Sequence, residues 1–259
     1  MLPKLITIGK FFIPTYGVLV ALGFLIGLWI TVRLARRANL PVEPITNLVI
    51  YCALAGLIGA KLFMVIFDFK QYWNDPASLI SLNTLQAAGV YQGGFLLALL
   101  TAVVYMRRNH LPALATCDVF APGIAAGQAI GRLGCFAAGC CWGTQCDHPW
   151  AVTFHNPQAQ DLTGVPLGVP LHPAQLYESL ADALIFATLF WMIRRPHRAG
   201  TTIGWYLVLY SAARFVIEFF RFHEQGLHLG LSWTQWISLG TLIAGAVLLV
   251  LRRGEVKVA

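Results

Sequence analysis

Seven runs of apolar residues follow one another along the chain, separated by shorter polar or charged segments. They cover approximately residues 13–33, 47–67, 89–107, 117–139, 175–193, 203–220 and 232–251. Each run is close to the ~20 residues that an α-helix needs to cross the apolar core of a bilayer. The pattern therefore predicts an all-α integral membrane protein with about seven transmembrane helices.

One connection differs from the others in length and composition. Residues 140–172 are polar, contain several prolines and glycines, and include the strand-like stretch 150–154. Such a segment favours turns and a short strand over another span. We expect a single polytopic membrane domain over 1–259, in which 140–172 forms an external insert, a small periplasmic cap, between spans four and five.

Composition supports a membrane protein and excludes an ordinary soluble domain. The chain is 58% hydrophobic and only 11% charged, whereas a soluble domain has about 25% charged residues. The net charge is +7, but no basic stripe with interleaved aromatic residues accompanies it, so we expect no nucleic-acid partner. The first apolar run lacks a small-x-small cleavage site, and we interpret it as a helix and not a cleaved signal peptide.

Lysines and arginines are distributed unevenly between the two sides of the predicted spans. Of the 18, eleven follow spans one, three, five and seven, four lie on the opposite side, and three lie within spans. Cytoplasmic loops carry the excess of positive charge in multi-pass proteins. We therefore expect the N-terminus and residues 140–172 on the outside and the C-terminus in the cytoplasm.

The three cations within spans lie at one depth. Lys61, Arg132 and Arg214 come six or seven residues before the external ends of spans two, four and six, which places each roughly 9–10 Å below the outer interface at about 1.5 Å per residue. Tyr16 and Gln92 lie at a similar level. Long cationic side chains at this depth can also reach the interface by snorkelling, which is the structural alternative to a binding site.

The counter-charge for these cations is the basis of a functional hypothesis. Glu218, four residues after Arg214, can pair with it, and we take Glu218 as the only acid within the predicted spans. An unpaired cation within the membrane costs about 2.5–3.5 kcal/mol on insertion scales. We therefore expect an anionic ligand, most simply a phospholipid phosphate, which the planar guanidinium of Arg132 can bind in a bidentate manner.

Small residues recur at spacing four around Arg132. Gly123, Gly127 and Gly131 begin the row, and Cys135 and Gly139 continue it. Small residues at this spacing let transmembrane helices approach closely. We predict a helix-packing ridge along the fourth span.

Several separate motifs resemble those of the prolipoprotein diacylglyceryl transferases, whose signature reads G-R-x-G-N-F-x-N-x-E-x-x-G. The matches within the signature are Gly131, Arg132, Gly134, Phe136, Gly139 and Gly143. The matches elsewhere are Tyr16-Gly17, a Gly-Gly turn at Gly93-Gly94, the run His172-Pro173-Ala174-Gln175-Leu176-Tyr177-Glu178, and the block from Arg214 through Glu218 to Arg221. Their order extends the resemblance over nearly the whole chain.

The resemblance implies an activity. Members of this family move a diacylglyceryl group from phosphatidylglycerol to the lipobox cysteine of a preprolipoprotein, and glycerol phosphate leaves. Arg132 and Arg214 would hold the phosphate and stabilise the departing charge, Lys61 would add a point charge, and Glu218 would orient Arg214. The resemblance also assigns Tyr16 and Gln92 to the catalytic set and Gly143, His172 and Arg221 to substrate binding. It implies no metal and no organic cofactor.

The chain departs from the family where the acceptor thiol would be handled. Gln92 stands where the family commonly has a histidine, Cys135 and Ala138 replace the two asparagines of the signature, and Cys140 replaces its glutamate. A glutamine cannot act as a general base. His172, Tyr16 and the cysteines themselves are the candidates to replace that base.

Four of the six cysteines form a C-x4-C-C-x4-C pattern at the end of span four. Three interpretations remain open: disulfides, which an oxidising compartment permits; a metal site with His148 nearby, although the spacing is not C-x-x-C; and a reactive thiol at Cys140. We expect Cys52 and Cys117 to be core residues. The histidines other than His172 are expected to be solvated loop residues, including His148.

Two alternative functions also remain open. A diverged paralogue could bind the same anionic phospholipid and act on another acceptor. A lipid-binding or transport protein without enzymatic activity could use the same arginines.

Overall fold

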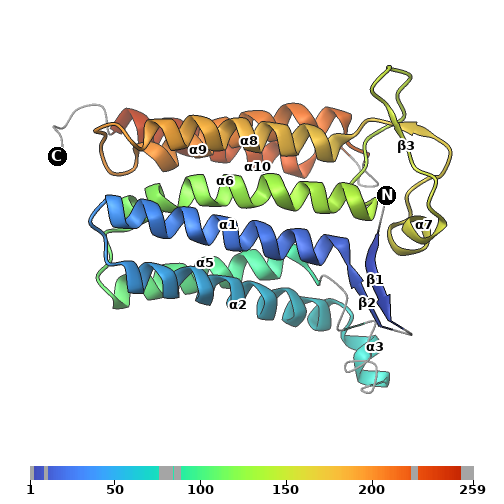
Figure 1. The fold of residues 1–259 in the computed structure, drawn as a ribbon, viewed down its shortest axis with the longest axis horizontal. Helices are drawn as coiled ribbons and strands as arrows, with labels where there is room; N and C mark the ends of the chain where they lie inside the picture. The colour runs from blue at the N-terminus through green and yellow to red at the C-terminus, as the bar shows by residue number, and fades with distance from the viewer. Residues whose placement is uncertain (1–2, 9–10, 76–83, 85–88, 223–226, 252–259) are drawn as a thin grey trace. The chain divides into compact units, whose positions relative to one another are not determined.

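A computed structural model of the 259-residue protein describes residues 3–8, 11–75, 84, 89–222 and 227–251 (Figure 1). Lys10, Arg252, Arg253 and Lys257, which enter the count that predicts orientation, lie outside these residues, as does His223. The chain divides into two compact units: Met1–Leu34 with Cys117–Ala259, and Ala35–Thr116.

A long helix covers most of each of the seven apolar runs. The first unit contains most of α1 (Thr15–Arg37) and α6 (Ala113–Ala138), together with α8 (Ala174–Met192), α9 (Thr201–Ile217) and α10 (Trp233–Leu251). A 3₁₀ turn, Glu218–Phe220, extends α9. The second unit contains α2 (Val42–Phe67), the short α3 (Phe69–Asn74) and α5 (Tyr91–Arg108).

Five of the helices within the described residues are long and apolar enough to cross a membrane: α1, α2, α6, α9 with its 3₁₀ extension, and α10. The other two long helices carry more polar side chains. Gln92 begins α5 and two arginines end it, while α8 contains Glu178 and Asp182. The chain is therefore an all-helical membrane protein in its main architecture, and the five apolar spans are the part of the prediction that length and composition support.

Helix α6 packs closely against α1 through the predicted row of small residues. A Cβ atom added to Gly23 would lie 2.6 Å from the carbonyl oxygen of Gly127, and one added to Gly27 would lie 2.7 Å from that of Gly123. Only glycine fits such a crossing. The packing ridge is thus confirmed for Gly123 and Gly127, whereas a Cβ at Gly131 would meet no atom within 4 Å.

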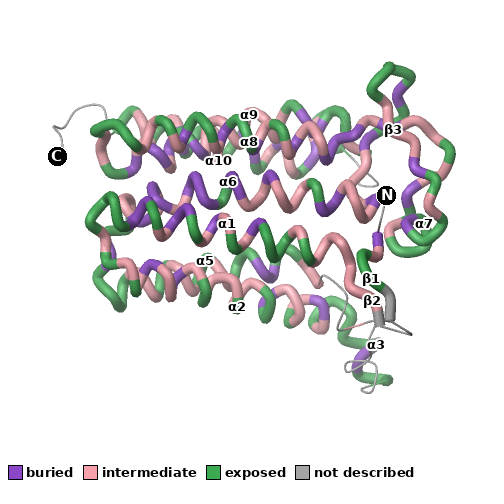
Figure 2. Tube along the Cα trace, viewed as in Figure 1, coloured by how far each residue is buried: buried purple, intermediate pink, exposed green. Residues whose placement is uncertain are grey.

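The opposite face of α6 contributes to an apolar core with α8 and α9. Ala121 and Ala125 are fully buried and pack with Ile185, Leu189 and Tyr206. Buried positions recur along α6 in Figure 2. This packing fixes the axial position of α6, and with it the position of the arginine near its end.

The second unit is built on a similar crossing between α2 and α5. A Cβ at Gly94 would lie 2.8 Å from the carbonyl oxygen of Gly56, and Gly93 meets Gly59 in the same way. Both Gly93 and Gly94 are buried inside α5. The expectation of a Gly-Gly turn is therefore wrong: the pair lies in a helix, where it removes side chains from the contact with α2.

The N-terminus forms a hairpin that the hydrophobic pattern did not predict. Strands β1 (Lys4–Ile8) and β2 (Phe11–Pro14) pair antiparallel, with Ile6 opposite Ile13 and an irregularity between Lys4 and Ile6. These strands are short and directly precede α1, so their apolar residues merge with the first predicted span.

The segment between α6 and α8 has its own small core. Strands β3 (Val152–Thr153) and β4 (Pro170–Leu171) pair antiparallel, which confirms a strand within 150–154. Helix α7 (Pro157–Thr163) starts at Asn156, whose side chain accepts a hydrogen bond from the backbone of Gln158 at 2.9 Å. The core residues are Phe154, Ala159, Val165 and Leu171.

Candidate functional site

A single carboxylate, Glu178 on α8, joins three arginines from separate parts of the first unit. Its Oε2 lies 2.5 Å from Nε of Arg132 on α6. Its Oε1 accepts hydrogen bonds from Arg214 on α9 at 3.1 Å and from Arg221, just beyond the 3₁₀ turn, at 3.0 Å. The Glu178 side chain is 5% exposed. This arginine cluster is the candidate functional site.

Glu218 forms the second carboxylate of the arginine cluster. Its Oε2 lies 2.7 Å from Nη1 of Arg214, which confirms the predicted pairing of residues four apart. Its Oε1 accepts a hydrogen bond from the hydroxyl of Ser232 at 3.0 Å. Because Ser232 immediately precedes α10, this bond fixes Glu218, and through it Arg214, against a neighbouring helix.

The assignment of Glu218 as the only acid among the cations is wrong. Glu178 and Asp182 lie on α8 and face the cluster, and Asp182 is within electrostatic range of Arg132 and Arg214. Both acids lie within the predicted span 175–193, and Glu178 belongs to the run that carries the family resemblance, so the signal was present in the sequence.

A fourth acid within the predicted spans has a different role. Asp118 on α6 accepts hydrogen bonds from the backbone N–H groups of Gly200 and Ile203 at 2.7 and 2.8 Å. These N–H groups lie at the start of α9, where a carboxylate is stabilised by unpaired donors and the helix dipole. Asp118 therefore caps α9.

Arg132 retains free hydrogen-bonding capacity. It contacts Glu178 through Nε, and its two terminal nitrogens have no hydrogen bond or ion pair within the described residues. Its side chain is 20% exposed. A guanidinium with a free pair of terminal N–H groups is the usual geometry for bidentate binding of a phosphate. The cluster can thus accept an anion without breaking its internal ion pairs.

Tyr16 lies beside this arginine. A Cβ at Gly134 on α6 would lie 3.3 Å from the carbonyl oxygen of Tyr16, so α1 passes close to α6 two residues after Arg132. The Tyr16 hydroxyl is within electrostatic range of Arg132 and of three cysteines, Cys135, Cys140 and Cys141. The structure thus places Tyr16 near Arg132, and its catalytic role stays a prediction.

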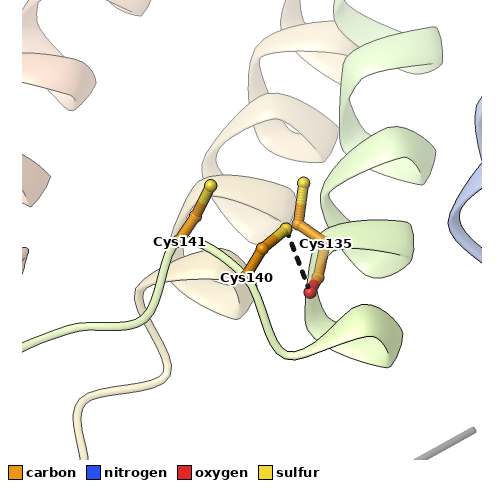
Figure 3. A group of neighbouring side chains, drawn as sticks. All are labelled: Cys135, Cys140 and Cys141. Carbon is orange, nitrogen blue, oxygen red and sulfur yellow. Dashed lines mark hydrogen bonds between the residues drawn. The ribbon is translucent and has the colours of Figure 1, made fainter. Parts of the chain in front are cut away.

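Those three cysteines gather at the end of α6. Cys135 lies in its last turn, and Cys140 and Cys141 follow a tight reversal with positive φ at Gly139 and Cys141 (Figure 3). Their sulfur atoms all lie within 4.8 Å of one another. All six cysteines of the chain are described and free. The disulfide interpretation is therefore not realised in this structure, because no pair of sulfurs is bonded.

The two thiols beyond the helix differ in acidity. Hydrogen bonds with Cys135 and Cys141 raise the pKa of Cys140 above its ordinary value. Hydrogen bonds from Cys135 and Cys140 lower the pKa of Cys141, and the positive charges of Arg221 and Arg132 act in the same direction. Of the two thiols, Cys140 is the less suited to act alone as a thiolate.

A cavity of about 370 Å³ lies beside the arginine cluster. It is lined by His148, Trp150, His172, Tyr177, Ile217 and Phe220. Nδ1 of His172 is 3.1 Å from the hydroxyl of Tyr177, the residue before Glu178, and that hydroxyl also accepts a hydrogen bond from Trp150 at 2.9 Å. Because Ile217 precedes Glu218, the cavity adjoins both carboxylates of the cluster.

The sequence predicted different roles for the two histidines of this cavity. His172, a predicted substrate-binding residue, lines the cavity. Burial, and after it the charge of His148, lowers the pKa of His172 from its usual value of 6.5, so the ring is neutral at pH 7. His148 is exposed in a loop, as expected, but it also lines the cavity, where its ring stacks on Trp150 with centroids 4.6 Å apart.

Gly143 lies where three backbone segments meet. Its N–H donates to the carbonyl of His172 at 3.0 Å, and Gly143 bridges Arg221. A Cβ at this position would lie 2.5 Å from the carbonyl oxygen of Phe220. The structure therefore gives this predicted substrate-binding residue a close packing role next to the cavity.

Two predicted site residues belong to the second unit. Lys61 on α2 donates a hydrogen bond from Nζ to the carbonyl of Thr84 at 2.6 Å. Gln92 is exposed in the first turn of α5. Both retain the roles that the resemblance implies only as proposals.

Comparison with known proteins identifies the family. The sequence model described as prolipoprotein diacylglyceryl transferase matches residues 3–251. The chain is 30% identical to the phosphatidylglycerol–prolipoprotein diacylglyceryl transferase of Clostridium tetani over 89% of each chain. It is 33% identical to the Bordetella parapertussis protein of the same name, over 94% of this chain and 92% of the relative. The chain therefore belongs to the prolipoprotein diacylglyceryl transferase family.

Proposed function

We propose that this protein transfers the diacylglyceryl group of phosphatidylglycerol to the thiol of a lipobox cysteine in a preprolipoprotein. The observation that carries the proposal is the arginine cluster on Glu178, with the terminal nitrogens of Arg132 open to a ligand. The relatives named for this reaction span nearly the whole chain.

The cluster supplies electrostatic catalysis. Arg132 binds two phosphate oxygens of the lipid, and Arg214 and Arg221 add positive charge on the same side of Glu178. As the acceptor sulfur bonds to the terminal glyceryl carbon, the carbon–oxygen bond to phosphate breaks and its electron pair leaves with glycerol phosphate. Preorganised guanidinium groups favour this step because the negative charge on the leaving group grows in the transition state.

The carboxylates hold these donors in place before the substrate arrives. Glu178 and Glu218 are almost completely buried, at 5% and 2% side-chain exposure. Each arginine is thereby restricted to one orientation, which reduces the reorganisation required when the phosphate binds. Glu178 and Glu218 act as positioning residues.

The cavity next to the cluster accommodates the acceptor peptide. Its aromatic walls suit apolar side chains, and the His172–Tyr177 pair provides polar groups at one side. A volume of about 370 Å³ is at the lower end of the ~300–1,000 Å³ typical of ligand pockets. It is sufficient for a few small residues around the reacting cysteine.

The proposed reaction requires a particular orientation of the protein in the membrane. Residues 140–172 form a periplasmic cap on a domain of seven membrane helices in the bacterial inner membrane, with a periplasmic N-terminus and a cytoplasmic C-terminus. Phosphatidylglycerol enters from the bilayer, and nucleic acid is not a partner. The family resemblance is the support for including Lys61 among the substrate-binding residues and Gln92 among the catalytic residues.

Purified protein incubated with phosphatidylglycerol and a lipobox peptide tests the proposal. We expect a peptide whose mass has increased by one diacylglyceryl group, together with free glycerol phosphate, as measured by mass spectrometry. A peptide with serine in place of the reacting cysteine, and phosphatidylcholine in place of phosphatidylglycerol, are the controls. Intact binding of phosphatidylglycerol without a thioether product would overturn the proposal in favour of a paralogue with another acceptor.

A further inference from the structure

The cluster of Cys135, Cys140 and Cys141 has no role in the phosphate chemistry proposed above. Its three sulfur atoms lie within 4.8 Å of one another, and all three thiols are free. Three thiols in this arrangement can ligate one thiophilic metal ion.

The surrounding structure fixes the cysteine cluster. Cys135 is 8% exposed within the last turn of α6. The reversal that brings back the other two requires positive φ at Gly139 and Cys141, 81° and 61°. Gln175, 1% exposed on α8, donates a hydrogen bond from Nε2 to the carbonyl of Cys140 at 2.6 Å. The turn is thus attached to the helix that carries Glu178, one turn before it.

The sulfur separations suit a zinc ion with an open position. Zinc–sulfur bonds of about 2.3 Å at tetrahedral angles place the sulfurs roughly 3.8 Å apart. The present spacing, at most 4.8 Å, needs only side-chain rotation to contract to that value. Structural zinc sites generally have four protein ligands, whereas catalytic sites have three and leave the fourth to substrate.

Cations near the cysteine cluster can balance the negative charge of such a site. Three thiolates exceed the charge of Zn²⁺ by one unit, so a site of this kind needs a neighbouring cation. Arg132 and Arg221 are both within electrostatic range of Cys141. Cys135 follows Arg132 by three residues on α6, so the two side chains lie on one face of the helix.

We propose that Cys135, Cys140 and Cys141 bind one Zn²⁺, and that its open position binds the acceptor thiol as a thiolate. The second part rests on the proposed transferase activity. On binding, the acceptor thiol releases its proton to solvent. Its sulfur then bonds to the glyceryl carbon, the carbon–oxygen bond breaks, and glycerol phosphate leaves with the electron pair. Zinc changes neither its charge nor its oxidation state.

This arrangement holds the attacking sulfur and the lipid phosphate on neighbouring groups of the protein. Arg132 holds the phosphate, and the metal holds the sulfur that attacks the carbon next to it. It also gives the thiol an activating group where the chain has Gln92 and cannot use a histidine. A metal-bound thiolate remains available at neutral pH because coordination to a metal lowers the pKa of a thiol.

Metal content tests the first part independently of activity. Full-length protein, purified under reducing conditions without chelators, is expected to contain about one zinc per chain. The variant Cys140→Ser should lose at least about 90% of it. Cys146→Ser, which removes a buried cysteine outside the cluster, should retain it. Absence of zinc in both wild type and reconstituted protein would overturn the proposal.

Cobalt substitution keeps the test valid if a cysteine variant fails to fold. Co²⁺ added to metal-free wild-type protein should produce the visible absorption of tetrahedral thiolate coordination. Addition of lipobox peptide should change that absorption, whereas the matching serine peptide should not. Unchanged spectra with both peptides would overturn the role of the open position.

The outcomes separate this inference from the proposed function. Diacylglyceryl transfer that continues at full rate in zinc-free protein would sink the metal proposal and leave the transferase intact. Stoichiometric zinc without any thioether product would support the metal site and count against the reaction. Loss of transfer on chelation, with recovery on addition of Zn²⁺, would support both.

Discussion

Arg132 of α6 and Glu178 of α8 form a direct ion pair, with Nε 2.5 Å from Oε2. The two residues are 46 positions apart, and the β3–β4 segment lies between them in the chain. The pair therefore joins the end of one helix to the first turns of another. Because Glu178 also binds Arg214 and Arg221, its loss affects every cation of the cluster at once.

Replacing Glu178 with glutamine tests this central role. The variant Glu178→Gln keeps the size of the side chain but leaves three guanidinium groups without their shared counter-charge. Breaking a buried pair on one side costs about 3–5 kcal/mol, and we expect a loss of about 3 kcal/mol in the free energy of unfolding, measured by denaturation in detergent micelles. Glu43→Gln, at an exposed acid in α2, should change it by less than about 0.5 kcal/mol. Equal stability of the two variants would contradict this prediction.

Replacing Arg132 with lysine separates charge from geometry. Arg132→Lys retains the positive charge but loses the pair of terminal N–H groups that can bind two phosphate oxygens. We expect kcat/KM for phosphatidylglycerol to fall by about 10- to 100-fold, equivalent to about 1.4–2.7 kcal/mol. Arg36→Lys, at an exposed position in the last turn of α1, is the matched control and should leave the rate unchanged. A rate unaffected by Arg132→Lys would show that charge alone is sufficient.

The acid side of the pH profile reports on His172. Its pKa is lowered, so the ring stays neutral through pH 7 and gains a proton only as the pH falls below 6.5. A charge in the aromatic cavity weakens binding of an apolar peptide segment. We expect KM for the acceptor peptide to rise below pH 6.5 and kcat to change less.

The variant His172→Gln should remove that rise in KM, because glutamine does not titrate. His155→Gln, at an exposed histidine between β3 and α7, should leave the pH profile as in the wild type. A rise in KM that persists in His172→Gln would assign the titration to another group.

Gly143→Ala tests whether this glycine packs or binds substrate. The added methyl group would lie 2.5 Å from the carbonyl oxygen of Phe220 and 2.6 Å from that of His172, which are backbone atoms and cannot rotate away. We expect a loss of about 1–3 kcal/mol in the free energy of unfolding. Gly240→Ala in α10, where a Cβ meets no atom within 4 Å, should be neutral or stabilising. Unchanged stability of Gly143→Ala with a raised KM would favour direct binding.

The positions of the seven long helices could be predicted from the sequence because each is a continuous apolar run. The ends differ by a few residues: α2 begins at Val42 and α6 at Ala113, before the apolar runs start at 47 and 117. The first turn of α2 contains Glu43 and Pro44, which interrupt the apolar run. The extra turn of α6, Ala-Leu-Ala-Thr from Ala113, is short and follows a proline, so the predicted apolar run starts later than the helix. The β1–β2 hairpin escaped prediction because its strands are as apolar as the helix that follows.

The arginines of the site could be predicted, and Glu178 was visible in a motif of the sequence, but its pairing with Arg132 could not be predicted. The pairing of Arg214 with Glu218 is local, since four residues bring the two side chains onto one helix face. The pairing of Arg132 with Glu178 depends on how α6 and α8 pack, which spacing along the chain does not determine. The aromatic cavity is non-local for the same reason, because Trp150, His172 and Phe220 come from three separate segments.

The junction at Gly143 also allows the wall of the aromatic cavity to change without a change in the position of the arginines. Gly143 donates to the carbonyl of His172 at 3.0 Å, and His172 donates to the carbonyl of Thr144 at 2.9 Å. These two bonds close residues 145–171 into a loop with a fixed base. Insertions, deletions or grafted sequences within that loop can reshape the wall that holds Trp150 and so retune which polypeptides are accepted. The guanidinium groups lie outside this loop and are held by Glu178 and Glu218, so such changes would leave their lipid chemistry intact.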